Sequence, residues 1–121
     1  MNLSIQAIPA FTDNYIWAII SSDKQVVLVD PGNGQASLDF LEKHRLKLQA
    51  ILITHRHQDH IGGLPLITSE YPVQVYGPKL KYVNQIVTEK DRINLLDGAM
   101  SLEVMAIPGH TKEHLAYFND E

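Results

Sequence analysis

Hydrophobic and polar residues alternate at residues 3–8, which predicts a half-buried strand ending at Pro9. Residues 15–20 predict a second strand. The wholly apolar run 26–29 predicts a buried third strand. The turn residues Asp23–Lys24 separate the second strand from the third, as in a hairpin. The chain is therefore expected to open with an antiparallel meander.

Helical and strand patterns alternate after this meander. Leu38, Phe40 and Leu41 stand among charged residues and predict an amphipathic helix from about Gln35 to Lys43, capped at the Gly34–Gln35 corner. The apolar run 50–54 predicts another buried strand. Strand, helix and strand in this order are typical of a crossover unit.

The second half of the chain predicts a further set of short elements. A helix is expected to end near Tyr71–Pro72, with Leu64, Leu66 and Ile67 on its inner face. The remaining predicted elements are, in order, a strand over 73–76, a short helix around 80–83, and strands over 92–95, 101–107 and 115–118. This order predicts an α/β protein with helices on both sides of a sheet.

Composition indicates one globular domain, because 45% of the 121 residues are hydrophobic. No apolar run approaches the roughly 20 residues of a membrane span, and the first residues lack the features of a signal peptide. A cytoplasmic protein without membrane contact is therefore expected. The net charge of −4, with dispersed Lys and Arg, argues against nucleic acid as a partner. Nothing in the sequence indicates the oligomeric state.

The chain contains no cysteine. This excludes disulfides, thiolate zinc sites and thiol nucleophiles together, so any bound metal must be held by nitrogen and oxygen.

Four potential metal ligands follow the buried strand 50–54, namely His55, His57, Asp59 and His60. A chance occurrence of this pattern in a chain of this composition is on the order of one in a thousand, so a solvated polar loop is the weaker interpretation. His55 and His57 are two residues apart and lie on the same side of an extended segment. Asp59 and His60 would face a second metal position. Two metals about 3.5 to 4 Å apart would activate a water for hydrolysis without a protein nucleophile.

Three further residues are candidates for the same site. His110 lies in the turn 108–111 and offers a fifth ligand; the alternative is a turn histidine bonded to a neighbouring carbonyl. His114 is interpreted either as a residue that contacts a metal ligand rather than the metal, or as a core histidine. Asp30, directly after a buried strand, either orients a ligand histidine or serves as a turn residue.

Several of these motifs together resemble the metallo-β-lactamase superfamily. They are the run 54–60 followed by Gly62–Gly63, the turn 108–111 downstream, and residues 29–32 upstream. The opening segment 8–17 further resembles the start of the glyoxalase II family, the hydroxyacylglutathione hydrolases. The likeness runs through nearly all of the chain. It implies a partial αββα sandwich, with the site along one sheet edge.

The resemblance also implies a ligand set and a reaction. His55, His57 and His110 would hold the first metal, and Asp59 with His60 would hold part of the second. Zinc is the expected metal, two ions in the complete family, with iron or manganese as alternatives. The reaction implied is hydrolysis of S-D-lactoylglutathione to glutathione and D-lactate, so the partner is a small-molecule thioester.

Two departures from the family pattern change this expectation. Glu113 stands where the family has a glycine before its second histidine, and the sequence finishes at residues 119–121, before the family's bridging aspartate and distal histidine. The thioester-binding part has no counterpart either. Residues 1–121 are therefore expected to be a metallo-β-lactamase-like domain that is incomplete at its C-terminal end and inactive alone.

Two alternatives remain open at this stage. One is another hydrolase of the same fold, such as a lactonase or phosphodiesterase; a β-lactamase is less favoured because no signal peptide is evident. The other is a non-catalytic metal-binding module, which the missing ligands favour. Metal binding without hydrolysis of any ester would distinguish the second alternative from the first.

Overall fold

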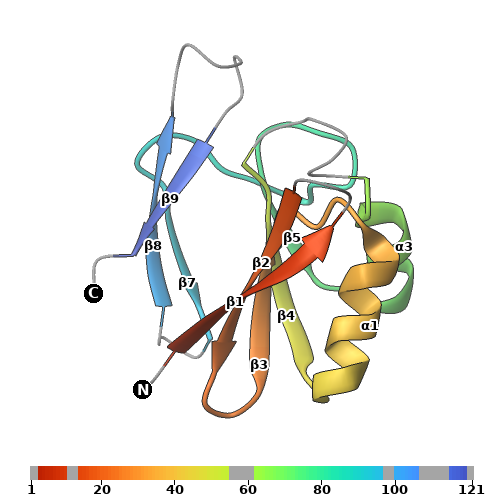
Figure 1. The fold of residues 1–121 in the computed structure, drawn as a ribbon. Helices are drawn as coiled ribbons and strands as arrows, with labels where there is room; N and C mark the ends of the chain where they lie inside the picture. Colours follow the sequence, from red (N-terminus) through yellow and green to blue (C-terminus); the bar gives the residue numbers. More distant parts are fainter. Residues whose placement is uncertain (1–2, 11–13, 55–61, 97–99, 107–114, 120–121) are drawn as a thin grey trace.

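The computed structural model describes residues 3–10, 14–54, 62–96, 100–106 and 115–119. Within these segments two β-sheets face one another, and two helices cover the outer side of the larger sheet (Figure 1).

The larger sheet begins with the predicted meander and continues with parallel strands. Its strands, in spatial and sequence order, are β1 (Leu3–Ala10), β2 (Asn14–Ser21), β3 (Gln25–Val29), β4 (Lys47–Leu52), β5 (Gln74–Gly77) and β6 (Gln85–Ile86). The strands β1, β2 and β3 pair antiparallel, whereas β3 to β6 pair parallel. The parallel pairing of β3 with β4 confirms the predicted crossover.

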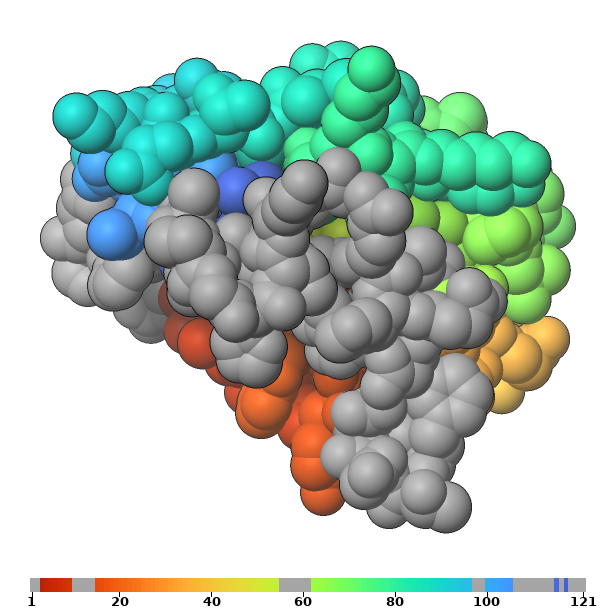
Figure 2. All heavy atoms as spheres, turned by 90° about the horizontal axis from the view of Figure 1, so that it is seen from above, coloured from red at the N-terminus to blue at the C-terminus, as the bar shows by residue number. Residues whose placement is uncertain are grey.

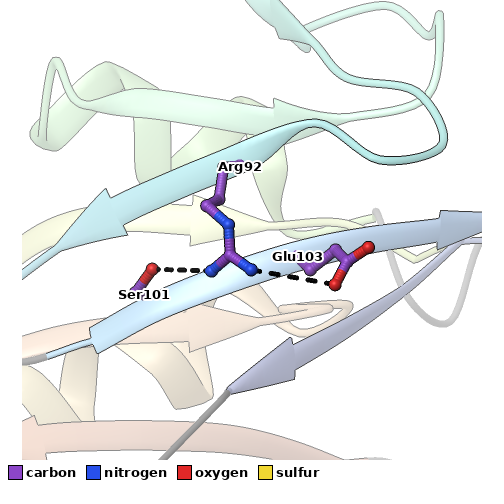
Figure 3. A network of polar contacts seen from close by, with 3 residues as sticks. All are labelled: Arg92, Ser101 and Glu103. Atoms are coloured by element: carbon purple, nitrogen blue, oxygen red, sulfur yellow. Dashed lines mark hydrogen bonds and ion pairs between the residues drawn. The ribbon is translucent and has the colours of Figure 1, made fainter.

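The smaller sheet is an antiparallel meander of β7 (Arg92–Leu95), β8 (Met100–Ala106) and β9 (Leu115–Asn119). Its outer face carries polar side chains. Arg92 donates to Ser101 Oγ over 3.0 Å and lies 3.8 Å from a carboxylate oxygen of Glu103, directly across the strand pair (Figure 3). Both charged side chains are almost half exposed, so their ion pair contributes less than about 1 kcal/mol.

Helix α1 (Gly34–His44) begins one residue before its predicted start and ends one residue after its predicted end. Its N-cap is Asn33, whose side-chain oxygen accepts from the Ala36 N–H over 3.0 Å; the expected capping corner at 34–35 is therefore wrong by one residue. Arg45, with a φ of 53°, ends the helix in the left-handed conformation.

Helix α3 (Leu64–Glu70) buries Leu64 and Ile67 as expected, but Leu66 is 41% exposed. The assignment of Leu66 to the inner face is wrong because a position two residues after Leu64 lies on the other side of a helix. Neither helix in the described segments has the length and apolar character needed to cross a membrane.

Strands β3 and β4 are buried on both faces. In β3, Val26 and Leu28 face the core under the helices, while Val27 between them faces the core between the sheets. In the described segments both helices lie on one face and the smaller sheet covers the other (Figure 1). The expectation of helices on both sides of the sheet was wrong. An apolar strand that is buried on both faces needs a covering layer on each face, but its sequence does not tell whether that layer is a helix or a second sheet.

The helix expected at 80–83 is also absent from this described part of the chain. Tyr82 has a φ of 73°, which no α-helix accommodates. The segment turns instead, and the Asn84 side chain accepts from the Val75 N–H over 2.9 Å and donates to the Val73 carbonyl over 3.3 Å. These bonds fix the segment against β5 before β6 begins.

Candidate metal centre

The candidate site follows the carboxyl end of β4, in the middle of the larger sheet. The strand pairing continues one residue past its end, because Ile53 N–H donates to the Tyr76 carbonyl over 2.8 Å. Thr54 comes next and is the residue before His55. Figure 2 looks onto this end of the molecule. Described residues of segment 79–95 lie along one side of it, and described residues of the N-terminal strands lie along the other.

Asp30, at the end of β3, fixes the main chain of Thr54. Its carboxylate accepts from the Thr54 N–H over 2.8 Å and from the Thr54 hydroxyl over 2.6 Å. The Asp30 N–H donates to the Leu52 carbonyl over 2.9 Å, and the residue is only 7% exposed. Asp30 also adopts a φ of 53°, a conformation that Asp tolerates better than most residues. Asp30 is therefore more than a turn residue: it holds the main chain immediately before the segment that carries the predicted ligands.

Gly63, which follows segment 55–61, is bonded to the turn directly after Asp30. Its N–H donates to the Pro31 carbonyl over 3.0 Å. A Cβ at this position would lie 2.3 Å from the Pro31 oxygen and 2.6 Å from the Gly34 nitrogen, so a larger residue could not approach so closely. Both flanks of segment 55–61 are thus attached to the turn that follows β3.

Strand β9 of the smaller sheet contacts the main chain directly after β4, at Ile53 and Thr54. The Leu115 N–H donates to the Thr54 carbonyl over 2.7 Å, and the Tyr117 hydroxyl donates to the Ile53 carbonyl over 2.6 Å. Burial raises the pKa of Tyr117, and the nearby negative charge of Asp30 raises it further, while the bond to Ile53 opposes the shift. The phenol therefore stays neutral and remains a donor.

The predicted ligands themselves lie outside the described residues: His55, His57, Asp59, His60 and His110, together with Glu113 and His114. Within the described segments no group of three or more His, Asp or Glu side chains could hold a metal. The structure fixes the flanks instead. Thr54 precedes one segment with predicted ligands and Leu115 follows the other, and Thr54 and Leu115 are hydrogen-bonded to each other.

Sequence reasoning missed two of these supporting residues. Thr54 appeared only as the last residue of a predicted strand and the first residue of the run 54–60, and Tyr117 appeared only as part of a strand. A weak signal existed for Tyr117, because a tyrosine in an apolar strand needs a hydrogen-bond partner when it is buried. The partner could not be named without the register between the two sheets.

Two hollows of about 460 Å³ each lie on the helix side of the larger sheet. Neither contains a histidine. The first is lined by Thr68, Pro72, Val73, Gln74, Tyr82, Val83 and Asn84, and the second by Gln35, Leu38, Asp39, Leu41, Glu42, Arg45, Leu46, Glu70 and Tyr71.

Comparison with known families gives a match to the metallo-beta-lactamase superfamily over residues 11–120. The chain belongs to this superfamily. The matched range contains every ligand predicted from the sequence, and it runs from the end of β1 to the end of β9.

Curated relatives match nearly the whole length of this chain. It is 47% identical over 122 residues to a hydroxyacylglutathione hydrolase of Vibrio parahaemolyticus, covering 98% of this chain and 48% of the relative. It is 45% identical over 119 residues to a hydroxyacylglutathione hydrolase of Hahella chejuensis, covering 96% of this chain and 46% of the relative. The chain thus spans about half the length of the curated relatives that it matches.

Solved structures confirm the fold class. The B3 metallo-beta-lactamase BLEG-1 superposes with a TM-score of 0.84 at 22% identity, covering 96% of this chain and 67% of that one. The ETHE1 protein of Myxococcus xanthus superposes with a TM-score of 0.79 at 24% identity, covering 98% and 54% respectively. At these identities the likeness establishes the architecture, which is the partial αββα sandwich expected from the sequence.

Proposed function

We propose that this chain carries the metal-binding part of a hydroxyacylglutathione hydrolase, an enzyme that cleaves the thioester of a hydroxyacylglutathione such as S-D-lactoylglutathione. The observation that carries the proposal is the 47% identity to the Vibrio parahaemolyticus hydrolase over 98% of this chain. The superfamily alone is compatible with several reactions, whereas curated relatives at 42–47% identity share this one name.

The proposed ligands are the five residues predicted from the sequence. His55, His57 and His110 would hold one metal, and Asp59 with His60 would contribute to a second. Imidazole and carboxylate donors suit zinc, with iron or manganese as alternatives. The described flanks are compatible with this assignment, because the bond between Thr54 and Leu115 joins the two segments that carry the ligands. A divalent metal there supplies water activation and polarisation of the thioester carbonyl.

The described residues contribute by holding main chain rather than by touching substrate. Asp30 orients Thr54 through its N–H and hydroxyl, and Leu115 holds the Thr54 carbonyl. A residue fixed at three polar groups gives the next residue, His55, a defined starting point. Pre-organised ligands lose less freedom when the metal binds.

We further propose that residues 1–121 bind about one metal and do not hydrolyse the thioester alone. Three neutral nitrogens with an open fourth position form a recognised zinc arrangement. The bridging aspartate, the distal histidine and the thioester-binding part implied by the family resemblance have no counterpart in these residues. The cytoplasmic location expected from the sequence stays a prediction.

A chimaera tests the proposed reaction. Residues 1–118 of this chain would be joined to the corresponding remainder of the Vibrio parahaemolyticus relative, purified with zinc, and assayed with S-D-lactoylglutathione. We expect turnover by the chimaera, its loss in the His57→Ala chimaera, and no turnover by residues 1–121. A folded, zinc-loaded chimaera that cleaves a lactone or a phosphodiester but no thioester would refute the proposed substrate. Zinc binding without cleavage of any ester would favour the non-catalytic module.

A further inference from the structure

Two successive carbonyls after β4 accept hydrogen bonds from alternate residues of β9. Ile53 accepts from the Tyr117 hydroxyl over 2.6 Å, and Thr54 accepts from the Leu115 N–H over 2.7 Å. The Tyr117 hydroxyl also lies 3.5 Å from the Tyr76 carbonyl, on the neighbouring strand β5. These contacts join the smaller sheet to the larger one across the core, and we call them the β4–β9 junction.

The β4–β9 junction stands between the two segments that carry the proposed ligands. Thr54 directly precedes segment 55–61, and Leu115 directly follows segment 107–114. Any sliding of β9 along β4 would therefore change the separation of the two segments. The Leu115 contact is made by the main chain, so the hydroxyl of Tyr117 is the side-chain contribution to this junction.

The ring of Tyr117 packs against the core between the sheets, so it would stay in place without its hydroxyl. The hydroxyl, through its hydrogen bond, fixes where the ring sits along β4. Apolar contacts tolerate small sliding movements, whereas a hydrogen bond weakens steeply when its distance or angle changes.

We propose that Tyr117 is a positioning residue of the proposed metal centre: its hydroxyl, through the Ile53 carbonyl, fixes β9 against the end of β4, where Thr54 and Leu115 adjoin the two segments that carry the predicted ligands His55, His57 and His110. This inference rests on the proposed function, since it needs those histidines to share a metal. Metal sites accept ligand distances within about 0.2 Å of their preferred values, so a small sliding of β9 is enough to weaken binding.

The test is Tyr117→Phe in the 121-residue chain, compared with Ser21→Ala as a matched control. Ser21 is also a buried hydroxyl, accepting from the Gln25 N–H over 3.2 Å, and it lies at the β2–β3 turn, at the opposite end of the larger sheet from Thr54 (Figure 1). Zinc affinity would be measured by competition with a chromogenic chelator. The absorption spectrum of the cobalt-substituted protein would report ligand geometry, and urea unfolding of the metal-free variants would report stability.

We expect Tyr117→Phe to weaken zinc binding by about tenfold and to change the cobalt spectrum, as substitutions behind metal ligands commonly do. Ser21→Ala should keep zinc affinity within about twofold and leave the spectrum unchanged, even where its stability loss is equal. Wild-type affinity and spectrum in Tyr117→Phe would overturn the positioning role and leave the metal centre standing. Absence of zinc binding by the wild-type chain, or wild-type binding by His57→Ala, would overturn the proposed metal centre and the inference with it.

Discussion

Replacing Asp30 tests most directly whether the carboxyl end of β4 is held as the structure indicates. In Asp30→Ala the Thr54 N–H and hydroxyl both lose their bonds to the carboxylate. Hydrogen bonds to a charged group contribute about 1.5–3 kcal/mol each, and recovery of the desolvation cost of the buried carboxylate offsets part of that sum. Alanine at a φ of 53° adds about 1 kcal/mol of strain. The free energy of unfolding should therefore fall by about 3–4 kcal/mol.

This loss is large for a domain whose total stability is about 5–15 kcal/mol, and it corresponds to a fall in Tm of about 12–16 °C. Two further variants separate its causes. Asp30→Asn keeps one acceptor oxygen and tolerates the left-handed conformation, so it should lose only about 1–2 kcal/mol. Asp30→Gly removes the carboxylate without the strain, and should be more stable than Asp30→Ala by about 1 kcal/mol.

The assay is urea unfolding, with amide hydrogen exchange to follow the Thr54 N–H itself. Asp91→Ala is the matched control, since Asp91 also accepts from a backbone N–H, that of Thr88 at 2.8 Å, but in an exposed turn. It should lose about 1 kcal/mol or less, because water replaces the lost acceptor. A loss below about 1 kcal/mol for Asp30→Ala, with unchanged exchange of the Thr54 amide, would show that the carboxylate does not hold this strand end.

Three further predictions concern the core, the ligands and the buried phenol. Ile16→Ala should cost about 2–5 kcal/mol in urea unfolding because Ile16 is 1% exposed, whereas Ile5→Ala should cost under about 1 kcal/mol because Ile5 is 66% exposed; equal losses would contradict this difference in burial. His57→Ala should lower bound zinc, measured by elemental analysis after desalting, far more than His114→Ala, and equal losses would mean that His114 is itself a ligand. Because the pKa of Tyr117 is raised, the folded state keeps a proton that the unfolded state loses above pH 10, the ordinary tyrosine pKa. This contribution to the free energy of unfolding is therefore complete below pH 10 and declines as pH rises further. Tyr117→Phe should flatten that decline in urea unfolding, and an unchanged slope would contradict the burial of the hydroxyl.

Local patterns were sufficient to predict most of the elements that make up the fold. The alternation at 3–8 and the apolar run at 26–29 predicted β1 and β3, and the leucine spacing after Asn33 predicted α1. These signals succeed because each reflects the period of one strand or helix. The covering layers were harder to predict, because Val27 is apolar whether a helix or a second sheet lies over it.

The error at 80–83 has a different origin. Leu80 and Val83 have helical spacing, but Tyr82 adopts a left-handed conformation, and Asn84 bonds to the backbone of β5. Such a side-chain contact competes with helix formation and is decided by tertiary structure. A period-based prediction has no means of detecting it.

A candidate metal site could be proposed from the sequence because four of its five predicted ligands lie within residues 55–60, whereas the residues that support the flanks of this segment are far apart in the sequence. Thr54 is held by Asp30, 24 residues earlier, and by Leu115, which belongs to the other sheet. Its N–H and hydroxyl are bonded to Asp30, the residue after β3, and its carbonyl is bonded to Leu115 of β9. A metal bound by His55 would therefore meet a main chain already fixed by β3 and β9, so its affinity should depend on the packing of the two sheets as well as on the donor atoms. That dependence distinguishes a centre built into the fold from a histidine-rich loop that happens to bind metal, for which substitutions at Asp30 and Tyr117 would leave zinc affinity unchanged.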